Sequence, residues 1–212
     1  MTWSKVSVLK KLAAHQAQPM RRSNEDIHHF PADETFKNLM FRKDKSLTPA
    51  AVLVPLINRL DEVTVLLTKR TDHLNNHAGQ ISFPGGRMDK NDRNPEQTAL
   101  RETEEEIGLT AKHIEIVGQL DDYFVGTGFL VRPFIGFIDP PFELAPHEIE
   151  VAEVFEAPLS FLANPSNFER HTREIEGTKR NYFAVQWNDY FIWGATAGML
   201  RNLSQRLWNG VQ

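Results

Sequence analysis

The chain has 212 residues, of which 41% are apolar and 25% are charged, and its net charge at pH 7 is −4. These values are typical of one globular domain with some elaboration, and they argue against a dedicated nucleic-acid surface, which needs a basic patch. The chain contains no cysteine, which excludes disulfides, thiol catalysis and thiolate metal sites. There is no signal-peptide core and no apolar run of about 18–20 residues that could span a bilayer, so we expect a cytoplasmic protein without membrane contacts.

Residues 1–48 are predicted to form a polar N-terminal extension, and residues 49–212 the main domain. The extension contains one amphipathic helix, predicted over Val6–Ala17, followed by a loop around Phe30–Asp33. We expect the extension to pack on the main domain or on a partner subunit. The apolar face of its helix is the one feature that points to a homodimer.

Apolar or alternating runs bounded by turn residues predict the strands of the main domain. The first two, Ala50–Leu56 and Val63–Lys69, are separated by the turn residues Asn58–Glu62 and predict a hairpin. Further strands are predicted over Gln80–Phe83 (before a Pro84-Gly85-Gly86 turn), Ile114–Leu120, Leu130–Ile138 and Glu153–Phe155, with a late hairpin of Tyr182–Trp187 and Tyr190–Ile192. A helical turn is predicted over Pro158–Ala163 and an amphipathic helix over Gly194–Trp208. These elements predict an α+β sandwich with helices on both sides of a central mixed sheet.

One further helix is predicted over Pro95–Ile107. Asn94 is a favourable N-cap, Pro95 suits the first helical position, and Gln97 completes a capping box. Gly108 suits the left-handed residue that ends a helix. The helical period places Leu100, Thr103 and Ile107 on one narrow stripe, which we interpret as the buried face.

The last turns of this helix carry an unusual group of acids. Glu102, Glu105 and Glu106 fall within one arc of about 100° away from the predicted buried stripe, whereas Glu104 points elsewhere. Anions near the carbonyl end of a helix are disfavoured by about 0.3–1 kcal/mol each. A solvated acidic face is the simpler interpretation of such a run. The helix position, the preceding glycine turn and the adjacent Arg101 favour a site for a divalent cation instead.

The whole segment resembles the Nudix box, which comprises a glycine, a spacer with an acid, Arg-Glu, an apolar position, a Glu pair and Gly-apolar. The matching residues are Gly86, Asp92, Arg101, Glu102, Thr103, Glu105, Glu106, Gly108 and Leu109. This sequence departs from the general motif in having Asp92 in place of Glu, Thr103 in place of an aliphatic residue, and a spacer one residue longer. The longer spacer and the aspartate also occur in the coenzyme A pyrophosphatase branch of the family.

A second motif lies upstream, between Leu66 and Gly86, and resembles the signature of the coenzyme A and acyl-coenzyme A branch. It reads LLT-x-R followed by a spaced glycine and FPGG, and it is matched by Leu66, Leu67, Thr68, Arg70, Gly79 and Phe83 to Gly86. Two positions differ: Thr71 replaces a smaller residue, and Asn75 stands where relatives often have arginine. A weaker third similarity is IWGATAGML at Ile192–Leu200, which resembles the start of the last helix of this branch.

The resemblance implies the Nudix α/β/α sandwich and a site that binds Mg²⁺ or Mn²⁺. Glu102 and Glu106 would be the principal metal ligands, and Glu105 a further ligand or the base that orients the attacking water. Arg101 would hold a carboxylate in place. Glu150 is a weaker candidate for an additional base or ligand, because an exposed loop acid is the simpler interpretation.

Other residues of the two motifs would serve the substrate. Gly85 and Gly86 would let the backbone approach the ion or a phosphate closely. Arg70 would either pair with a substrate phosphate or form a structural salt bridge.

The reaction implied is hydrolysis of the pyrophosphate bond of coenzyme A or its thioesters. The products would be 4′-phosphopantetheine, or its acyl form, and adenosine 3′,5′-bisphosphate. One alternative is a Nudix hydrolase for another nucleoside diphosphate derivative, such as ADP-ribose or a dinucleotide, and the Asn75 departure is its main support. A second is a non-catalytic ligand sensor that retained the fold, against which the three retained glutamates argue.

Overall fold

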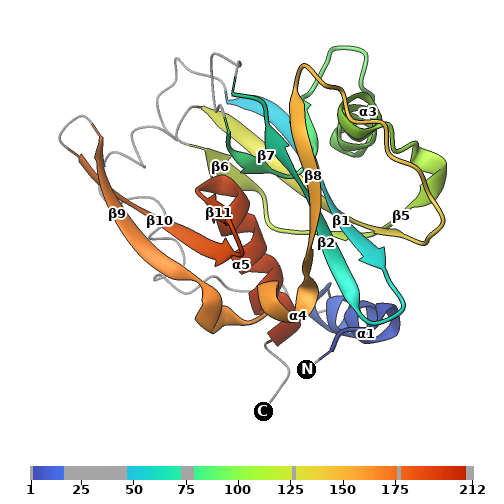
Figure 1. The fold of residues 1–212 in the computed structure, drawn as a ribbon. Helices are drawn as coiled ribbons and strands as arrows, with labels where there is room; N and C mark the ends of the chain where they lie inside the picture. The colour runs from blue at the N-terminus through green and yellow to red at the C-terminus, as the bar shows by residue number, and fades with distance from the viewer. Residues whose placement is uncertain (1, 17–46, 73–78, 126–127, 176–177, 209–212) are drawn as a thin grey trace.

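The computed structural model describes residues 2–16, 47–72, 79–125, 128–175 and 178–208. The backbone forms an α+β sandwich in which helix α3 (Pro95–Ile107) covers one face of a central sheet and helix α5 (Ala195–Trp208) lies on the other side (Figure 1). This arrangement confirms the predicted fold class. Among the described residues, no helix is both long enough and apolar enough to cross a membrane.

The central sheet has eight strands and mixed directions. Its main path runs β3 (Ile81–Ser82), β2 (Val63–Arg70), β1 (Thr48–Asn58), β7 (Phe129–Ile138) and β5 (Ile114–Gln119). Strands β1 and β7 pair in parallel over ten residue pairs from Thr48–Phe129 to Ile57–Ile138, and the remaining pairings are antiparallel. The other members are β4 (Gly85–Arg87) beside β1, β6 (Tyr123–Val125) beside β7, and β8 (Val151–Pro158) beside β2.

Strand β1 explains why the sheet is covered on both sides. Its alternate residues Ala50, Val54 and Leu56 lie in the same apolar cluster as residues of α5. Ala51 clusters with Ala99 of α3, and Ile57 clusters with Ile107 of α3. Side chains of a strand alternate between its two faces, so a strand that is apolar at nearly every position must be buried on both.

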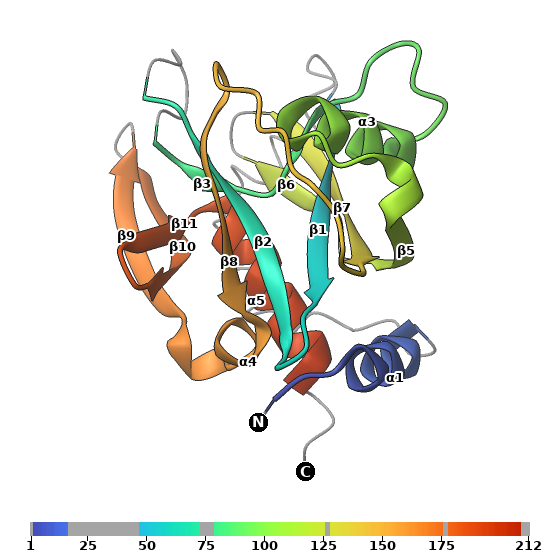
Figure 2. The ribbon, with the colours of Figure 1, turned by 45° about the vertical axis from the view of Figure 1, so that its right-hand side comes forward.

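A second sheet of three antiparallel strands adjoins the first, in the order β11 (Tyr190–Trp193), β10 (Thr178–Trp187) and β9 (Glu169–Ile175). Figure 2 shows this sheet beside α5 and α4 (Leu159–Leu162). The ring of Tyr190 stacks on that of Phe155 of β8, with centroids 3.6 Å apart. The second sheet is therefore joined to the central sheet through β8.

The first helix, α1 (Lys5–Gln16), packs on the remainder of the chain. Trp3, Val8 and Leu12 are buried in the main apolar cluster, and the amide of Val63 donates to the carbonyl of Trp3 over 2.9 Å. The helix begins one residue before the predicted Val6. The predicted loop around Phe30–Asp33 lies outside the described residues.

Most predicted elements of the main domain are confirmed within a few residues, but three strands were not anticipated. The predicted Pro84-Gly85-Gly86 turn continues directly into β4, which pairs with β1. Pairing this close requires glycine, because a Cβ on Gly85 would lie 2.4 Å from the carbonyl oxygen of Ala51. Strand β9 has no apolar alternation, since its sequence ERHTREI is mostly charged, and its pairing with β10 decides its conformation. The third, β6, is only three residues long.

Candidate active site

Helix α3 begins and ends at the predicted residues. The side chain of Asn94 accepts a hydrogen bond from the Gln97 amide over 2.8 Å, and Gly108 ends the helix in the left-handed region at φ 72°. The capping box differs in one detail, because the Gln97 side chain accepts from the amide of Arg93 rather than from that of Asn94. These caps fix the start and stop of the helix, and therefore the positions of its glutamates.

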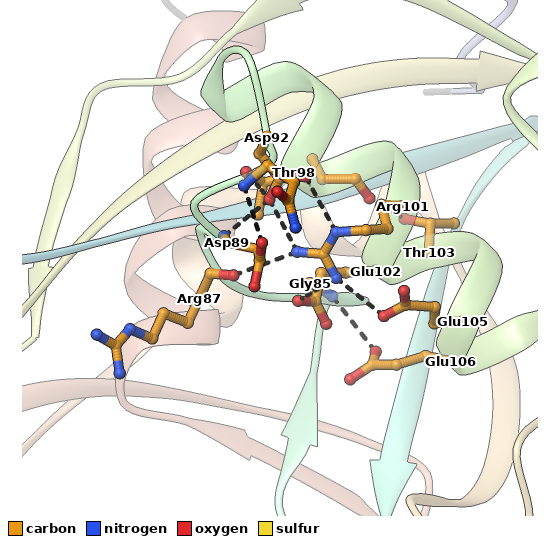
Figure 3. Close-up of polar contacts among 12 residues, drawn as sticks. Gly85, Arg87, Asp89, Asp92, Thr98, Arg101, Glu102, Thr103, Glu105 and Glu106 are labelled. Carbon is orange, nitrogen blue, oxygen red and sulfur yellow. Dashed lines mark hydrogen bonds and ion pairs between the residues drawn. The ribbon is translucent and has the colours of Figure 1, made fainter.

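Arg101 lies at the centre of a polar network between α3 and the segment that precedes it (Figure 3). Its Nε and Nη2 atoms donate to the two carboxylate oxygens of Asp92, over 3.0 and 2.9 Å. Its Nη1 atom lies 2.9 Å from a carboxylate oxygen of Glu102 and 2.9 Å from one of Glu105. Its Nη2 atom also donates to the carbonyl of Arg87, over 3.3 Å. One guanidinium thus links the helix, strand β4 and the intervening loop.

Asp92 is buried, and every contact that it makes favours its charged form. The hydroxyl of Thr98 and the amide of Asp89 both donate to its Oδ2 atom over 2.9 Å, in addition to the two bonds from Arg101. The Arg101 guanidinium, followed by these two donors, holds the pKa of Asp92 well below its usual range.

The carboxylates of Glu102 and Glu106 both face the Gly85-Gly86 segment of β4. The amide of Gly85 donates to Oε2 of Glu106 over 3.3 Å. A Cβ on Gly86 would lie 2.5 Å from Cδ and from Oε2 of Glu102, so only glycine leaves room for this carboxylate. The two acids of α3 therefore lie against backbone that has no side chain to cover them.

Arg70, at the end of β2, reaches the same place. Its Nη1 atom is 3.6 Å from Oε1 of Glu106, and its side chain is 26% exposed, whereas that of Glu106 is 6% exposed. The residue thus borders Glu106 with a side chain that is partly exposed. Arg70 is ion-paired with Glu106, and pairing of its guanidinium with a substrate phosphate stays a prediction.

Burial dominates the electrostatics of the two acids. It raises the pKa of Glu106 to about 7; the charge of Arg70 and the Gly85 amide oppose this shift, whereas the charges of Glu102 and Glu150 add to it. Burial also raises the pKa of Glu102, against the hydrogen bond and charge of Arg101, and the charges of Glu105 and Glu150 contribute. For both carboxyls, burial outweighs the opposing effect of the arginine partner.

Glu150 lies in a different part of the chain from Glu102 and Glu106. It precedes β8, and its charge acts on both Glu102 and Glu106. Its side chain is 45% exposed, and its Oε1 atom is 4.0 Å from Nδ1 of His147. The sequence placed Glu150 on a loop without showing which acids it would approach.

The predicted buried stripe of α3 needs one correction. Thr103 and Ile107 are buried, but Leu100 is only partly buried and Glu106 lies on the buried side. Glu106 turns inward because β4, with its two glycines, packs against the last turn of the helix. Glu105 differs from Glu106, because its side chain is 59% exposed and forms an ion pair with Arg101.

The donor chemistry of these residues suits a hard divalent cation. Glu102 and Glu106 supply oxygen donors. Burial raises the pKa of both carboxyls, so an added positive charge would stabilise their ionised forms. Among the described residues, no three acidic or histidine side chains converge closely enough to enclose an ion. Their oxygens are oriented instead toward Arg70 and Arg101.

Two contributors to the site were missed by sequence reasoning. Thr98 supports Asp92 through its hydroxyl, and the carbonyl of Arg87 accepts from Arg101. The first had a usable signal, because a threonine on the first turns of a helix can reach the loop before it. The second is a backbone contact that no residue type reveals.

Comparisons with known proteins agree with this architecture. A family model described as "NUDIX domain" matches residues 47–188. A protein of Yersinia pestis (strain Pestoides F), named "Uncharacterized Nudix hydrolase NudL", is 38% identical over 158 residues, which cover 74% of this chain and 79% of that protein. A protein of the same name from Yersinia pseudotuberculosis (serotype O:1b, strain IP 31758) gives the same values. The solved structure of the MutT protein from Methanosarcina mazei Go1 has a similar fold, with a TM-score of 0.50 and 16% identity over 78% of this chain and 96% of that one.

Proposed function

The chain belongs to the Nudix family, and we propose that this Nudix hydrolase cleaves the pyrophosphate bond of coenzyme A or of its thioesters in a reaction that depends on Mg²⁺ or Mn²⁺. Nudix hydrolases act on small nucleotide-derived substrates and generally use a divalent metal ion. The substrate and the individual roles of the residues are the proposed part.

The observation that carries the proposal is that the two sequence motifs meet at one carboxylate. Glu106 of the box helix contacts Arg70 of the LLT-x-R motif over 3.6 Å and the Gly85 amide of the FPGG motif over 3.3 Å. The motif that resembles the coenzyme A branch thus borders the acids of the general Nudix motif. A substrate held by the first motif would have its pyrophosphate next to the second.

Glu102 and Glu106 would hold the metal ion, with Glu105 or Glu150 as a further oxygen donor. When bound, the ion would neutralise the pyrophosphate and stabilise the charge that develops on its oxygens. Arg101 would keep Glu102 and Glu105 in place through its bonds to Asp92. The exposed part of Arg70 would pair with a phosphate through its planar guanidinium.

The reaction needs no side-chain nucleophile, because phosphoryl transfer depends mainly on positioning and electrostatics. The oxygen of a water molecule would bond to one phosphorus of the pyrophosphate, and the bond from that phosphorus to the bridging oxygen would break. The bridging oxygen would leave with the other phosphoryl group. The proton of the water would pass to a carboxylate, either Glu105 or Glu150, and then to solvent. The products are two phosphomonoesters, 4′-phosphopantetheine or its acyl form and adenosine 3′,5′-bisphosphate.

The test is a comparison of turnover by the purified protein on coenzyme A, acetyl-coenzyme A, ADP-ribose and diadenosine polyphosphates, with Mg²⁺ or Mn²⁺ and with EDTA. We expect the highest kcat/KM for a coenzyme A compound, no turnover in EDTA, and the two products named above by chromatography. Equal or higher kcat/KM for ADP-ribose or a dinucleotide would overturn the substrate. Absence of turnover on all of them, with ligand binding retained, would favour the sensor.

A further inference from the structure

Strand β9 lies at the edge of the second sheet. In the order β11-β10-β9 it pairs with β10, in a regular register that runs from Glu169–Ala184 to Ile175–Thr178. In both views of the ribbon, β9 lies on the outside of the molecule, away from α3 (Figure 1, Figure 2). Within the described part of the chain, no backbone hydrogen bond joins its other edge to another segment. Such an edge presents a row of amides and carbonyls that can pair with another strand.

The register of the second sheet shows which backbone groups face outward. The Phe183 carbonyl of β10 accepts from the amide of Gly194 over 3.1 Å, so the backbone polar groups of Phe183 are directed toward β11. Phe183 lies opposite Arg170, whose own amide and carbonyl are therefore directed away from β10. These groups alternate in direction along a strand, so those of Thr172 and Glu174 are also directed outward.

The side chains of the same three residues lie on one face of β9 and carry an ordered set of charges. A cation, Arg170, and an anion, Glu174, lie at equal distances on either side of Thr172, and all three are exposed. Arg170 and Glu174 are about 13 Å apart in an extended strand, so they are too distant to pair with each other. Among the described side chains, the only ion pair of β9 joins His171 to Glu169 on the opposite face, over 3.2 Å.

An antiparallel strand of the same sequence fits this edge when the two Thr172 residues lie opposite each other. In that register Arg170 of each copy lies opposite Glu174 of the other copy, and outward-directed backbone groups meet outward-directed backbone groups. Registers centred on Arg170 or on Glu174 would instead place like charges directly opposite each other, which is destabilising. A two-fold axis between the Thr172 residues makes the contact self-complementary, as a symmetric dimer requires.

The opposite face of β9 accepts the same register. Arg173 of each copy lies opposite His171 of the other copy and diagonally from Glu169. Diagonal neighbours across two strands are about 7–8 Å apart, which long side chains can reach. Arg173 therefore lies within reach of an anion on this face as well.

We propose that this protein forms a homodimer in which the β9 strands of two copies pair in an antiparallel register centred on Thr172, so that their three-stranded sheets become one continuous sheet. Charged side chains on an edge strand usually prevent pairing, but here each charge of Arg170 and Glu174 meets its opposite on the second copy. The apolar face of α1 is not available for a partner, because Val8 and Leu12 are buried within the chain itself. This inference does not depend on the proposed substrate or metal.

The test measures the monomer–dimer dissociation constant of the full-length protein by sedimentation equilibrium over a series of concentrations. The variants are Glu174→Arg, Arg170→Glu, the double variant Arg170→Glu/Glu174→Arg, and Thr172→Pro. Glu143→Arg is the matched control, because it makes the same change of charge at an exposed acid outside β9. Circular dichroism and thermal melting check that each variant is folded.

We expect the wild-type protein to dimerise. Glu174→Arg and Arg170→Glu should each raise the dissociation constant by at least about tenfold, because the two-fold axis turns each change into two repulsive pairs. Thr172→Pro should be monomeric, since proline removes an outward-directed amide without removing a bond to β10. Glu143→Arg should stay within about twofold of wild type.

Two combinations should restore the dimer, because both bring opposite charges together again. In an equal mixture of the single variants, Arg170→Glu on one copy meets Glu174→Arg on the other, so heterodimers should form. The double variant exchanges the two charges within one chain and should dimerise like wild type.

A wild-type protein that stays monomeric at every concentration would overturn the inference. A dimer that neither charge reversal nor Thr172→Pro weakens would overturn it too, because another surface would then hold the copies together. The charge variants alone decide the matter if Thr172→Pro does not fold. Failure of both the mixture and the double variant to recover the dimer would reject the register centred on Thr172.

Discussion

The guanidinium of Arg70 lies 3.6 Å from the carboxylate of Glu106, and this contact connects the end of β2 to the last turn of α3. The pair is unequal, because Glu106 is almost fully buried and Arg70 is partly exposed. The charge of Arg70 opposes the effect of burial on the pKa of Glu106, while the Arg70 side chain stays partly exposed. Removing either partner therefore has separable effects on stability, metal binding and substrate binding.

Glu106→Gln should abolish metal-dependent turnover and leave the fold intact. The amide retains the shape of the side chain but loses the charge that a dication would bind. Turnover of coenzyme A with Mg²⁺ measures the effect, and circular dichroism checks the fold. Glu104→Gln is the matched control, since Glu104 is an exposed acid on the same turn of the helix. Unchanged turnover in Glu106→Gln would contradict the metal assignment.

Without metal, Glu106→Gln should be more stable than wild type, and the difference in stability should grow as pH rises. Burial raises the pKa of Glu106 to about 7, above its ordinary value of 4.5, so the native state holds a proton that the unfolded chain has released between these values. Wild-type stability should therefore fall as pH rises from about 4.5 to 7, by at most about 1.4 kcal/mol per pH unit for this group. Glu106→Gln should lack this decrease and be more stable at pH 8 by about 1–3 kcal/mol.

Urea unfolding in EDTA, at intervals from pH 4.5 to 8, measures both proteins. Parallel curves for the two would show that Glu106 ionises in the native protein as readily as in the unfolded chain. That result would remove the electrostatic argument for a cation at this position.

Asp92→Asn should destabilise the protein by about 2 kcal/mol at pH 7, because the paired guanidinium loses its anionic partner. Since the pKa of Asp92 is lowered in the native state, its contribution is complete above the unfolded value near 4 and declines as pH falls below it. The difference between wild type and variant should therefore shrink toward pH 2. Asp89→Asn, at an exposed acid in the same turn, should change unfolding midpoints little at any pH.

Gly86→Ala should mainly weaken Mg²⁺ binding, whereas Gly85→Ala should mainly lower stability. A Cβ on Gly86 meets the end of the Glu102 side chain, which can move away, so we expect weaker Mg²⁺ binding with a small loss of stability. A Cβ on Gly85 meets backbone of Ala51 and Val52 at 2.4 and 2.5 Å, so we expect a severe loss of stability. Calorimetry and thermal melting distinguish the two effects, and a Gly85→Ala protein that melts like wild type would contradict this geometry.

Arg70→Gln should raise the KM for coenzyme A by about tenfold, the size expected for losing one charge-assisted hydrogen bond. The change removes a cation that borders the site, whereas Lys69→Gln alters the preceding residue and should have little effect on KM. Steady-state kinetics over a range of coenzyme A concentrations measures both. A lower kcat with an unchanged KM would indicate that Arg70 serves only as the partner of Glu106.

Local signals in the sequence determined the helices and the strands with apolar alternation. The caps at Asn94 and Gly108 specify the two ends of α3, and each cap bonds a residue no more than four positions away. The apolar run of β1 likewise indicates burial on both faces. The charged strand β9 carries no such signal, because its conformation depends on pairing with β10.

The sequence by itself determined which acids this protein carries and that they share one end of a helix. Only the tertiary structure decided that Glu106 is buried, that Glu105 is exposed, that Arg70 pairs with Glu106, and that the charge of Glu150 acts on Glu106 from another segment. The physical reason is the range of the forces involved. Helical periodicity and capping act over a few residues, whereas the burial and charge that shift a carboxyl pKa come from whichever segments the fold brings together.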